Sequence, residues 1–239
     1  MAFVFTPPAT VGLPVSGSDE LFPVRRVYCV GRNYAAHARE MGKDPTREKP
    51  FFFMKPADCV ADSGGTLPYP PLTANLHHEI ELVVAIATGG SDIAVADALA
   101  HAWGYGVGVD LTRRDLQEEA KAAGRPWDWG KGFDKSAPCG PLSPAACTGH
   151  PVAGRIWLSV NGDTRQQGDL AELIWSVPEI IAACSASVRL EPGDLIFTGT
   201  PAGVGPLLPG DHVIGGVDGI GTIEFTIGVA AGVVAATLR

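Results

Sequence analysis

The segment from His77 to Ala87 constrains the fold of this chain more than any other, because it combines a strand pattern with two closely spaced carboxylates. It consists mostly of branched apolar residues and contains neither proline nor glycine, which is typical of a β-strand. Successive side chains of a strand point to opposite faces, so Glu79 and Glu81 share one face, with Cα atoms about 7 Å apart. Two such carboxylates beside an apolar run are costly to bury unless a positive charge lies between them.

A third carboxylate, Asp110, ends another short run that begins at Trp103. Three converging carboxylates form an all-oxygen site, which suits a hard divalent cation such as Mg²⁺, Mn²⁺ or Ca²⁺. A Glu-x-Glu pair on a strand more often marks a solvated face, and spacing alone does not separate the two interpretations.

Residues 33–41 are predicted to form a short helix, with Asn33 as its N-cap and Gly42 as its stop signal. His37 and Glu40 are three residues apart on this helix and therefore share a face. By spacing alone the commoner interpretation is a surface ion pair. The functional alternative is a general base, in which His37 takes a proton from water while Glu40 orients its ring.

A second helix is predicted after Asp110, from a capping box at residues 112–115 to about Ala123. Arg114 and Gln117 are three residues apart on it, so they share a face just beyond the carboxylate.

Two glycine-rich segments carry further polar side chains. Lys131 lies between Gly130 and Gly132, which permit a close approach of the backbone to another group, although a flexible turn is the plainer interpretation. Residues 198–205 follow a predicted strand and contain Thr200, so their N–H groups and hydroxyls can face an anion. This segment lacks the Gly-Lys-Ser/Thr sequence of a phosphate-binding loop.

The rest of the chain alternates short apolar runs with glycine and proline turns, which predicts a β-rich C-terminal two-thirds. Further strands are predicted at 24–31, 51–55 and 195–197, a hairpin around Asn161-Gly162, and helices at 94–102 and 176–185. The apolar run 227–238 is predicted to be a terminal strand or a packed tail.

Length and composition exclude several classes of protein. The 239 residues fit one large domain or one domain with a small appendage, and the net charge of −8 argues against a nucleic-acid partner. The five scattered cysteines form no zinc pattern, which favours reduced thiols in a cytoplasmic protein. Residues 1–17 carry no basic residue and are unlike a signal peptide. The run 227–238 is shorter than the roughly 20 residues of a membrane span, so no membrane partner is expected.

Together the motifs form an ordered set. Its members are Gly31-Arg32-Asn33-Tyr34 with His37 and Glu40, Lys55-Pro56, His77-His78-Glu79-Ile80-Glu81, Asp110 with residues 112–117, Trp127 with Lys131, and residues 199–205. This set resembles the fumarylacetoacetate hydrolase family from about Val24 to Gly221. Residues 23–53 look most like the bacterial fumarylpyruvate hydrolases of gentisate breakdown, and acylpyruvases share nearly the same motifs.

The resemblance implies an α+β, β-rich fold, a mixed β-roll with short peripheral helices. It implies an N-terminal arm of residues 1–22, a single catalytic domain of residues 23–239, and a homodimer. The implied cofactor is a divalent metal, Mg²⁺ or Mn²⁺ with Ca²⁺ as a further candidate. The implied site residues are Glu79, Glu81 and Asp110 on the metal, His37 and Glu40 as catalytic residues on a lid helix, Lys131 as a catalytic residue at the substrate oxygens, and Arg114, Gln117 and Thr200 in substrate binding.

The implied substrate is a small 2,4-diketo acid, and the implied reaction is hydrolysis of its carbon–carbon bond. Fumarylpyruvate would give fumarate and pyruvate in the breakdown of aromatic compounds. The same framework also suits an acylpyruvase, an oxaloacetate decarboxylase or a muconate-type isomerase.

Two alternatives lie outside this family. A non-haem iron oxygenase needs two histidines and a carboxylate facing one site, whereas on a strand His78 points away from His77. A calcium-stabilised binding module would leave His37, Lys131 and Arg114 without a role.

Overall fold

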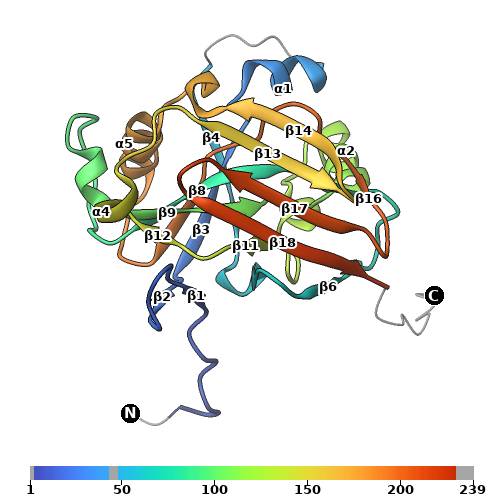
Figure 1. Ribbon diagram of the computed structural model, residues 1–239, viewed down its shortest axis with the longest axis horizontal. Coiled ribbons are helices and arrows are strands. Elements are labelled where there is room, and N and C mark those ends of the chain that lie inside the picture. The colour runs from blue at the N-terminus through green and yellow to red at the C-terminus, as the bar shows by residue number, and fades with distance from the viewer. Residues whose placement is uncertain (1–2, 43–47, 230–239) are drawn as a thin grey trace.

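Two curved β-sheets pack against each other and enclose most of the hydrophobic core (Figure 1). The computed structural model describes residues 3–42 and 48–229. The larger sheet has eight strands, in the order β4 (Phe51–Lys55), β3 (Arg26–Gly31), β15 (Asp194–Phe197), β8 (Ile80–Ile86), β9 (Ala102–Val109), β11 (Ala137–Cys139) and β5 (Val60–Asp62), with β12 (Ser143–Pro144) paired to β9.

The second sheet lies in front of the first in Figure 1. Its five strands have the order β14 (Asp163–Asp169), β13 (Arg155–Val160), β17 (His212–Val217), β18 (Gly221–Gly228) and β6 (Thr66–Pro68). Two smaller sheets complete the set, namely β10 (Thr112–Arg113), β7 (Leu76–His78) and β16 (Gly205–Leu207) in one, and β1 (Gly12–Pro14) with β2 (Leu21–Pro23) in the other. Asn161 and Gly162, both with positive φ, form the predicted hairpin turn between β13 and β14.

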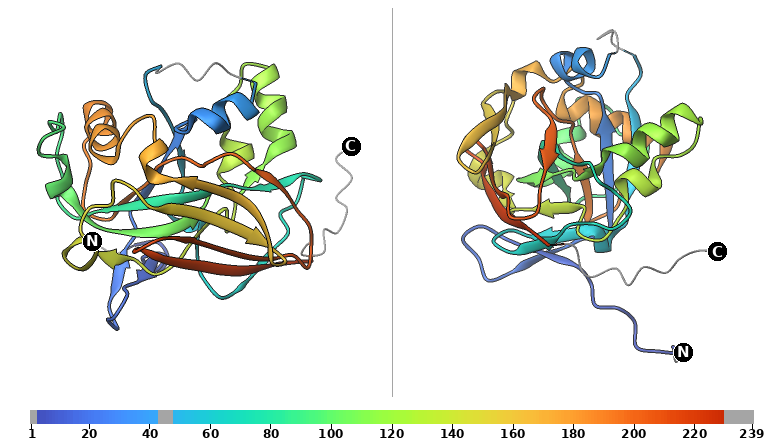
Figure 2. Two further views of the ribbon diagram at one scale, coloured as in Figure 1. Left: turned by 45° about the horizontal axis from the view of Figure 1, so that its top comes forward. Right: turned by 90° about the vertical axis from the view of Figure 1, so that its right-hand side faces the viewer.

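Short helices lie at the periphery of the sheets. They are α1 (Ala35–Glu40), α2 (Arg114–Ala122), α3 (Asp128–Lys131), α4 (Ala145–Thr148) and α5 (Val177–Ser187), with 3₁₀ helices at Ala57–Cys59, Ala98–His101 and Leu170–Glu172. Both views in Figure 2 show α1 and α2 on the same side of the molecule. Within residues 3–42 and 48–229, every helix falls short of the length and apolar character that crossing a membrane requires.

Side-chain alternation along β8 directs the two glutamates to one face. Its even-numbered side chains, from Ile80 to Ile86, belong to the core cluster between the two sheets. The odd-numbered Val83 and Ala85 belong to a second cluster on the opposite face of the larger sheet. Glu79 and Glu81 follow the odd-numbered register, so they lie on this second face, beyond its apolar side chains.

The pairing of β8 with β9 brings the third carboxylate to the same face. The two strands are antiparallel with Glu81 opposite Gly108, and the Asp110 N–H donates to the Glu79 carbonyl at 2.8 Å. Asp110 is therefore the cross-strand neighbour of Glu79. A Cβ atom on Gly108 would lie 2.5 Å from the ring of Phe197, so glycine is needed for the sheet to pack here.

The predicted α+β, β-rich class is confirmed, but two predicted elements differ from the structure. The strand predicted over residues 77–87 is interrupted at Glu79 and forms β7 and β8. Residues 94–102 contain a 3₁₀ helix at Ala98–His101 in place of an α-helix. This segment is mostly exposed, so it lacks the apolar face that stabilises an α-helix by packing.

Asn33 is not the N-cap of α1, and its side chain instead ties α1 to two distant segments. The N-cap position is Tyr34, which makes no side-chain cap bond. The buried Asn33 amide donates to the carbonyls of Thr198 at 2.8 Å and Trp175 at 2.9 Å, and its oxygen accepts from the Trp175 N–H at 2.7 Å. These contacts fix the start of α1 beside the glycine-rich segment that follows β15.

The capping box predicted at residues 112–115 is also absent. The N-cap of α2 is Arg113, without a side-chain cap bond. Asp115 accepts from the Thr73 hydroxyl at 2.6 Å and the Ala74 N–H at 3.0 Å, while the Thr112 hydroxyl donates to the Asp110 carbonyl at 3.1 Å. The Asp115 carboxylate is therefore bound by distant residues, and the Thr112 hydroxyl is turned back to Asp110, in place of the reciprocal bonds that the pattern suggested.

The two ends of the chain differ in how they contact the sheets. The β1–β2 hairpin packs on the larger sheet, with Leu13 and Phe22 in the second core cluster. The preceding residues extend away from the sheets, and Phe3 and Phe5 are exposed (Figures 1 and 2). The apolar run predicted at 227–238 contributes the end of β18, and its part beyond residue 229 lies outside the described residues.

Candidate active site

A pocket of about 100 Å³ opens between α1, α2 and the larger sheet. It brings together every predicted site residue except Glu40, which is exposed and does not line it. The predicted residues that line it are His37, Glu79, Glu81, Asp110, Arg114, Gln117, Lys131 and Thr200.

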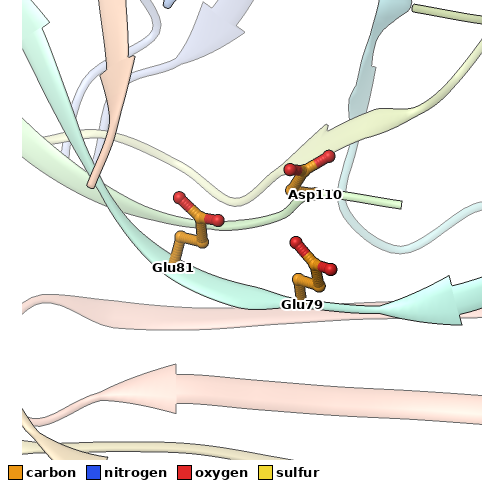
Figure 3. Close-up of side chains that lie close together, drawn as sticks. All are labelled: Glu79, Glu81 and Asp110. Atoms are coloured by element: carbon orange, nitrogen blue, oxygen red, sulfur yellow. The ribbon is translucent and has the colours of Figure 1, made fainter. Parts of the chain in front are cut away.

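Three buried carboxylates form the floor of this pocket. Glu79 and Glu81 project to the same side of β8, and Asp110 faces them from the end of β9 (Figure 3). One oxygen from each lies within 4.8 Å of the others, and each side chain is buried. The solvated face that the spacing also allowed is therefore excluded.

Lys131 lies between two of the carboxylates. Its Nζ donates to Glu79 Oε2 at 2.8 Å, to Asp110 Oδ2 at 2.6 Å and to the Thr112 hydroxyl at 2.7 Å. Burial alone would lower the pKa of Lys131, but the two carboxylates outweigh it and raise that pKa. The side chain is thus a fixed ammonium group on α3, and the flexible turn that was the plainer interpretation of the flanking glycines is not what forms.

Arg114 holds Glu79 from the opposite side. Its Nη2 forms a close ion pair with Glu79 Oε1, and its Nη1 donates to Gln117 Oε1 at 2.6 Å. Burial would raise the pKa of Glu79, but Lys131 and Arg114 overcome this and lower it. Glu79 therefore remains ionised, and the amide oxygen of Gln117 is already engaged by Arg114.

Lys55 is a part of the site that our residue-by-residue predictions left out. Its fully buried Nζ lies 2.9 Å from Asp110 Oδ1 and donates to the carbonyls of Leu111 at 3.1 Å and Lys131. The signal was present in the sequence, because Lys55 closes the otherwise apolar run of β4 and belongs to the Lys55-Pro56 motif.

Glu81 forms no ion pair with a cation in the part of the chain that the structure describes. It accepts a hydrogen bond from the Gly199 N–H at 2.6 Å, and burial together with Asp110 and Glu79 raises its pKa well above the usual value. The glycine-rich segment predicted to face an anion thus binds the carboxylate of Glu81. Glycine is required there, because Gly199 has a φ of +99° and a Cβ atom would lie 2.7 Å from Asn33.

The carboxylates fit a hard divalent cation. Oxygen atoms bound to one such ion at about 2.1–2.6 Å lie at most roughly 5 Å apart, as these do. Asp110 Oδ1 is buried and has no hydrogen-bond donor, since the approach of Lys55 lacks hydrogen-bond geometry. The unpaired charge of Glu81 and this unsatisfied oxygen are what a bound cation would compensate.

His37 and Glu40 form a pair at the wall of the pocket. His37 Nδ1 lies 3.1 Å from Glu40 Oε2, and the Gly203 N–H donates to Glu40 Oε1 at 3.0 Å. Only 8% of the His37 side chain is exposed, whereas 33% of the Glu40 side chain is, so the pair lies at the surface with its histidine lining the pocket. The predicted lid spans residues 35–50, of which residues 43–47 lie outside the described residues.

Gln166 connects the pocket to the second sheet, and sequence reasoning missed it. Its buried amide donates to the Thr200 hydroxyl and the Pro201 carbonyl, both at 2.8 Å. Its oxygen lies 2.9 Å from His78 Nδ1 and accepts from the Ile80 N–H at 3.1 Å. No local pattern marks Gln166, because its partners come from distant parts of the chain.

We expect Gln166→Leu to lower the free energy of unfolding by about 2–4 kcal/mol, because it leaves several buried polar groups without partners. Urea unfolding measures this effect. Gln167→Leu is the matched control, since Gln167 is exposed on the same strand and should change stability by about 0.5 kcal/mol or less. Equal stability of the two variants would show that the network has no structural role.

The two histidines beside the glutamates do not form an iron site. His78 is directed to Gln166, and neither His77 nor His78 lines the pocket. His77 Nε2 lies 2.9 Å from Asn75 Oδ1, and burial followed by the charge of Arg114 lowers the pKa of His77 to about 4. Among the described residues, the metal-ligating group consists of carboxylates alone.

Curved sheets that carry carboxylates, cations and a histidine around one pocket define an enzyme site able to hold a divalent cation. The chain matches the family model described as fumarylacetoacetate (FAA) hydrolase C-terminal over residues 26–228. It belongs to the fumarylacetoacetate hydrolase family. The predicted family and its β-roll fold are thereby confirmed.

The relatives whose names state a function differ in the reaction that they catalyse. The structure of fumarylpyruvate hydrolase from Pseudomonas aeruginosa in complex with Mn²⁺ and pyruvate is 54% identical, with a TM-score of 0.93, and the match covers 95% of this chain and 100% of that one. A fumarylpyruvate hydrolase of Ralstonia sp is 45% identical over 188 residues, which are 78% of this chain and 97% of that protein. A mitochondrial oxaloacetate tautomerase of Mus musculus is 41% identical over 203 residues, 85% of this chain and 91% of that protein.

Proposed function

We propose that this protein hydrolyses the carbon–carbon bond of a 2,4-diketo acid, with fumarylpyruvate as substrate and fumarate and pyruvate as products. The observation that carries the proposal is the single pocket in which three buried carboxylates face a histidine–glutamate pair. The similarity to fumarylpyruvate hydrolases supports this substrate. The reaction belongs to the breakdown of aromatic acids.

Glu79, Glu81 and Asp110 would hold the divalent metal, Mg²⁺ or Mn²⁺. When bound, the metal supplies positive charge that polarises the keto oxygen and stabilises negative charge on it. The related Pseudomonas enzyme, solved with Mn²⁺ and pyruvate, supports a divalent ion in this pocket.

His37 acts as the general base. Its Nδ1 lies beside the Glu40 carboxylate, which can only accept, so the tautomer with the proton on Nδ1 is favoured and Nε2 is left to accept a proton from water. The water oxygen then bonds to the distal keto carbon, and the bond between this carbon and the adjacent methylene breaks. The distal part leaves as fumarate, and the methylene carbon takes up a proton to complete pyruvate.

Lys131 and Arg114 provide fixed positive charge during this reaction. The electron pair of the broken bond delocalises onto the 2-keto oxygen as an enolate, which is the least stable species of the sequence. A buried ammonium group stabilises such charge because it needs no reorganisation at the moment of bond cleavage. Arg114, Gln117 and Thr200 hold the substrate carboxylate and keto groups.

We expect His37→Ala to lower kcat by about 10²–10⁴-fold, because loss of a general base typically has this effect. Metal binding should not change, since His37 is not among the carboxylate ligands. The measurement is initial rate together with calorimetric titration of Mg²⁺. His212→Ala is the control, because His212 pairs with Glu224 at 2.8 Å on an exposed surface. Near-normal turnover by His37→Ala would remove the pair from the mechanism.

Oxaloacetate tautomerase activity is the second candidate, supported by the relative from Mus musculus. Tautomerisation needs proton transfer and a stabilised enolate but no attack by water. Purified Mg²⁺-loaded protein should therefore be given fumarylpyruvate, acetylpyruvate and oxaloacetate in parallel, with the ultraviolet diketo absorbance followed and the products identified. Fast formation of fumarate and pyruvate supports the hydrolase, whereas conversion confined to oxaloacetate supports the tautomerase.

The homodimer and the cytoplasmic location remain predictions. Light scattering on the purified protein measures the molar mass in solution, and a value of twice the 24.9 kDa chain mass supports the dimer.

A further inference from the structure

Two positive side chains on the pocket wall are not used in the mechanism above. Arg32 and Lys121 both line the pocket that holds the carboxylates. Within residues 3–42 and 48–229, neither has a carboxylate at ion-pair distance. Among the described residues, therefore, no carboxylate pairs with these two positive charges of the pocket.

An aromatic wall holds the two cations beside each other. The guanidinium carbon of Arg32 lies 5.3 Å from the centre of the Phe51 ring, and Lys121 Nζ lies 5.1 Å from the Trp127 ring. The two rings meet edge to face, with centres 5.3 Å apart. Aromatic faces attract cations without neutralising them, so both charges stay available to an anion in the pocket.

The position of Lys121 on α2 sets its distance from the carboxylates. Arg114, Gln117 and Lys121 follow the i, i+3, i+7 spacing of one helix face, and all three line the pocket. The helix rise places Lys121 about 10 Å beyond Arg114 along the axis. Burial, then the charges of Arg114 and Arg32, lowers the pKa of Lys121, which agrees with a site crowded by like charges.

The backbone at Arg32 is held in an unusual conformation that directs its side chain to this wall. Its φ is +58°, in the left-handed region that costs a residue other than glycine about 1–2 kcal/mol. The neighbouring Gly31 allows the Phe51 ring to lie against the backbone, since a Cβ atom there would be 2.0 Å from the ring. Backbone strain of this kind clusters at active sites and ligand-binding sites.

We propose that Arg32 and Lys121 bind a second carboxylate at the distal end of the substrate. The pocket thereby selects a dianionic diketo acid over one whose acyl group is uncharged. This inference rests on the proposed function, which places the first carboxylate and the keto groups beside Arg114 and Lys131. The planar guanidinium group can engage the distal carboxylate with two hydrogen bonds, while the ammonium group supplies a point charge.

Calorimetry with a matched pair of ligands tests the subsite without requiring turnover. The probes are 2-oxoadipate and 2-oxohexanoate, which share a chain length and a 2-oxo acid group but differ in the distal carboxylate. The Mg²⁺-loaded wild type should bind the diacid about 10- to 100-fold more tightly, the range expected for hydrogen bonds to charged groups. Lys121→Met or Arg32→Gln should reduce this preference to below about threefold.

Two further variants separate a specific contact from general electrostatics. Lys121→Arg keeps the charge and should retain most of the preference. Arg125→Gln removes one positive charge just after α2, from a side chain that is 71% exposed and outside this pocket, and should leave the preference unchanged. Loss of preference in Arg125→Gln to the same degree would overturn the subsite.

Kinetics with fumarylpyruvate and acetylpyruvate completes the test. In Lys121→Met the ratio of kcat/KM for the two substrates should fall by about 10- to 100-fold, because only fumarylpyruvate has a distal carboxylate. Equal loss on both substrates would overturn the inference. Wild-type hydrolysis without a diacid preference rejects the subsite alone, whereas a diacid preference without hydrolysis supports the subsite and rejects the proposed hydrolase.

Discussion

Replacing Glu81 with glutamine should lower kcat/KM by about 10³-fold or more. A catalytic metal ion supplies several kcal/mol of charge stabilisation, and Glu81 is the carboxylate of the triad that forms no ion pair with a cation in residues 3–42 and 48–229. Glutamine preserves the volume of the side chain and can still accept the hydrogen bond from the Gly199 N–H. The expected loss therefore reports the missing negative charge.

The same substitution should stabilise the metal-free protein at alkaline pH. Because the pKa of Glu81 is raised in the folded state, stability is greatest below its unfolded value of about 4.3 and falls as the pH rises toward the folded value. Glu81→Gln removes this loss, so with chelator at pH 8 the variant should be more stable than the wild type. Urea unfolding between pH 4 and pH 9 measures the difference.

Added Mg²⁺ should make the wild type more stable than Glu81→Gln. A ligand at 100 times its Kd stabilises the folded state by about 2.7 kcal/mol, and the wild type should gain this from Mg²⁺ while Glu81→Gln gains little. Glu118→Gln is the control, because Glu118 is exposed on α2 and should behave as wild type. Equal stabilisation of Glu81→Gln and wild type by Mg²⁺ would exclude Glu81 as a ligand.

The carboxylate triad shows which part of the site can be predicted from a single sequence. Alternation along a strand is a local property, so the shared face of Glu79 and Glu81 followed from their spacing. The place of Asp110 beside Glu79 depends on the pairing of β8 with β9, which no local pattern determines. Their convergence was therefore a hypothesis from the sequence, and the resemblance to a known family supported it.

The residues that sequence reasoning missed or misplaced are those with distant partners. Asn33 before an apolar segment is typical of an N-cap, but its amide contacts Thr198 and Trp175. Gln166 occupies an ordinary position in the alternating pattern of β14, yet its amide donates a hydrogen bond to the Thr200 hydroxyl. In each case a tertiary contact decides the role of a side chain whose local pattern suggests another role or none.

Lys131→Met should be the most destabilising substitution in the pocket. Its ammonium group donates to Glu79 and Asp110, and removing one partner of a buried ion pair typically costs about 3–5 kcal/mol, because the remaining charges lose their compensation. Lys121→Met is the matched control in the same pocket. It removes the same charge from a side chain that pairs with no carboxylate among the described residues, and should change the free energy of unfolding by about 0.5 kcal/mol or less.

Lys131→Met should strengthen the binding of Mg²⁺ and weaken catalysis. In the wild type the ammonium group repels a divalent cation and shares its oxygens, so the variant should bind Mg²⁺ more tightly and recover stability when Mg²⁺ is added. Turnover at saturating Mg²⁺ should nevertheless fall by about 10²–10³-fold, because the enolate loses a fixed positive charge. Calorimetry and initial rates on the same preparation measure both effects. Weaker Mg²⁺ binding by Lys131→Met would show that Lys131 supports the metal site, whereas tighter binding with lost turnover assigns it to the charge that develops on the substrate.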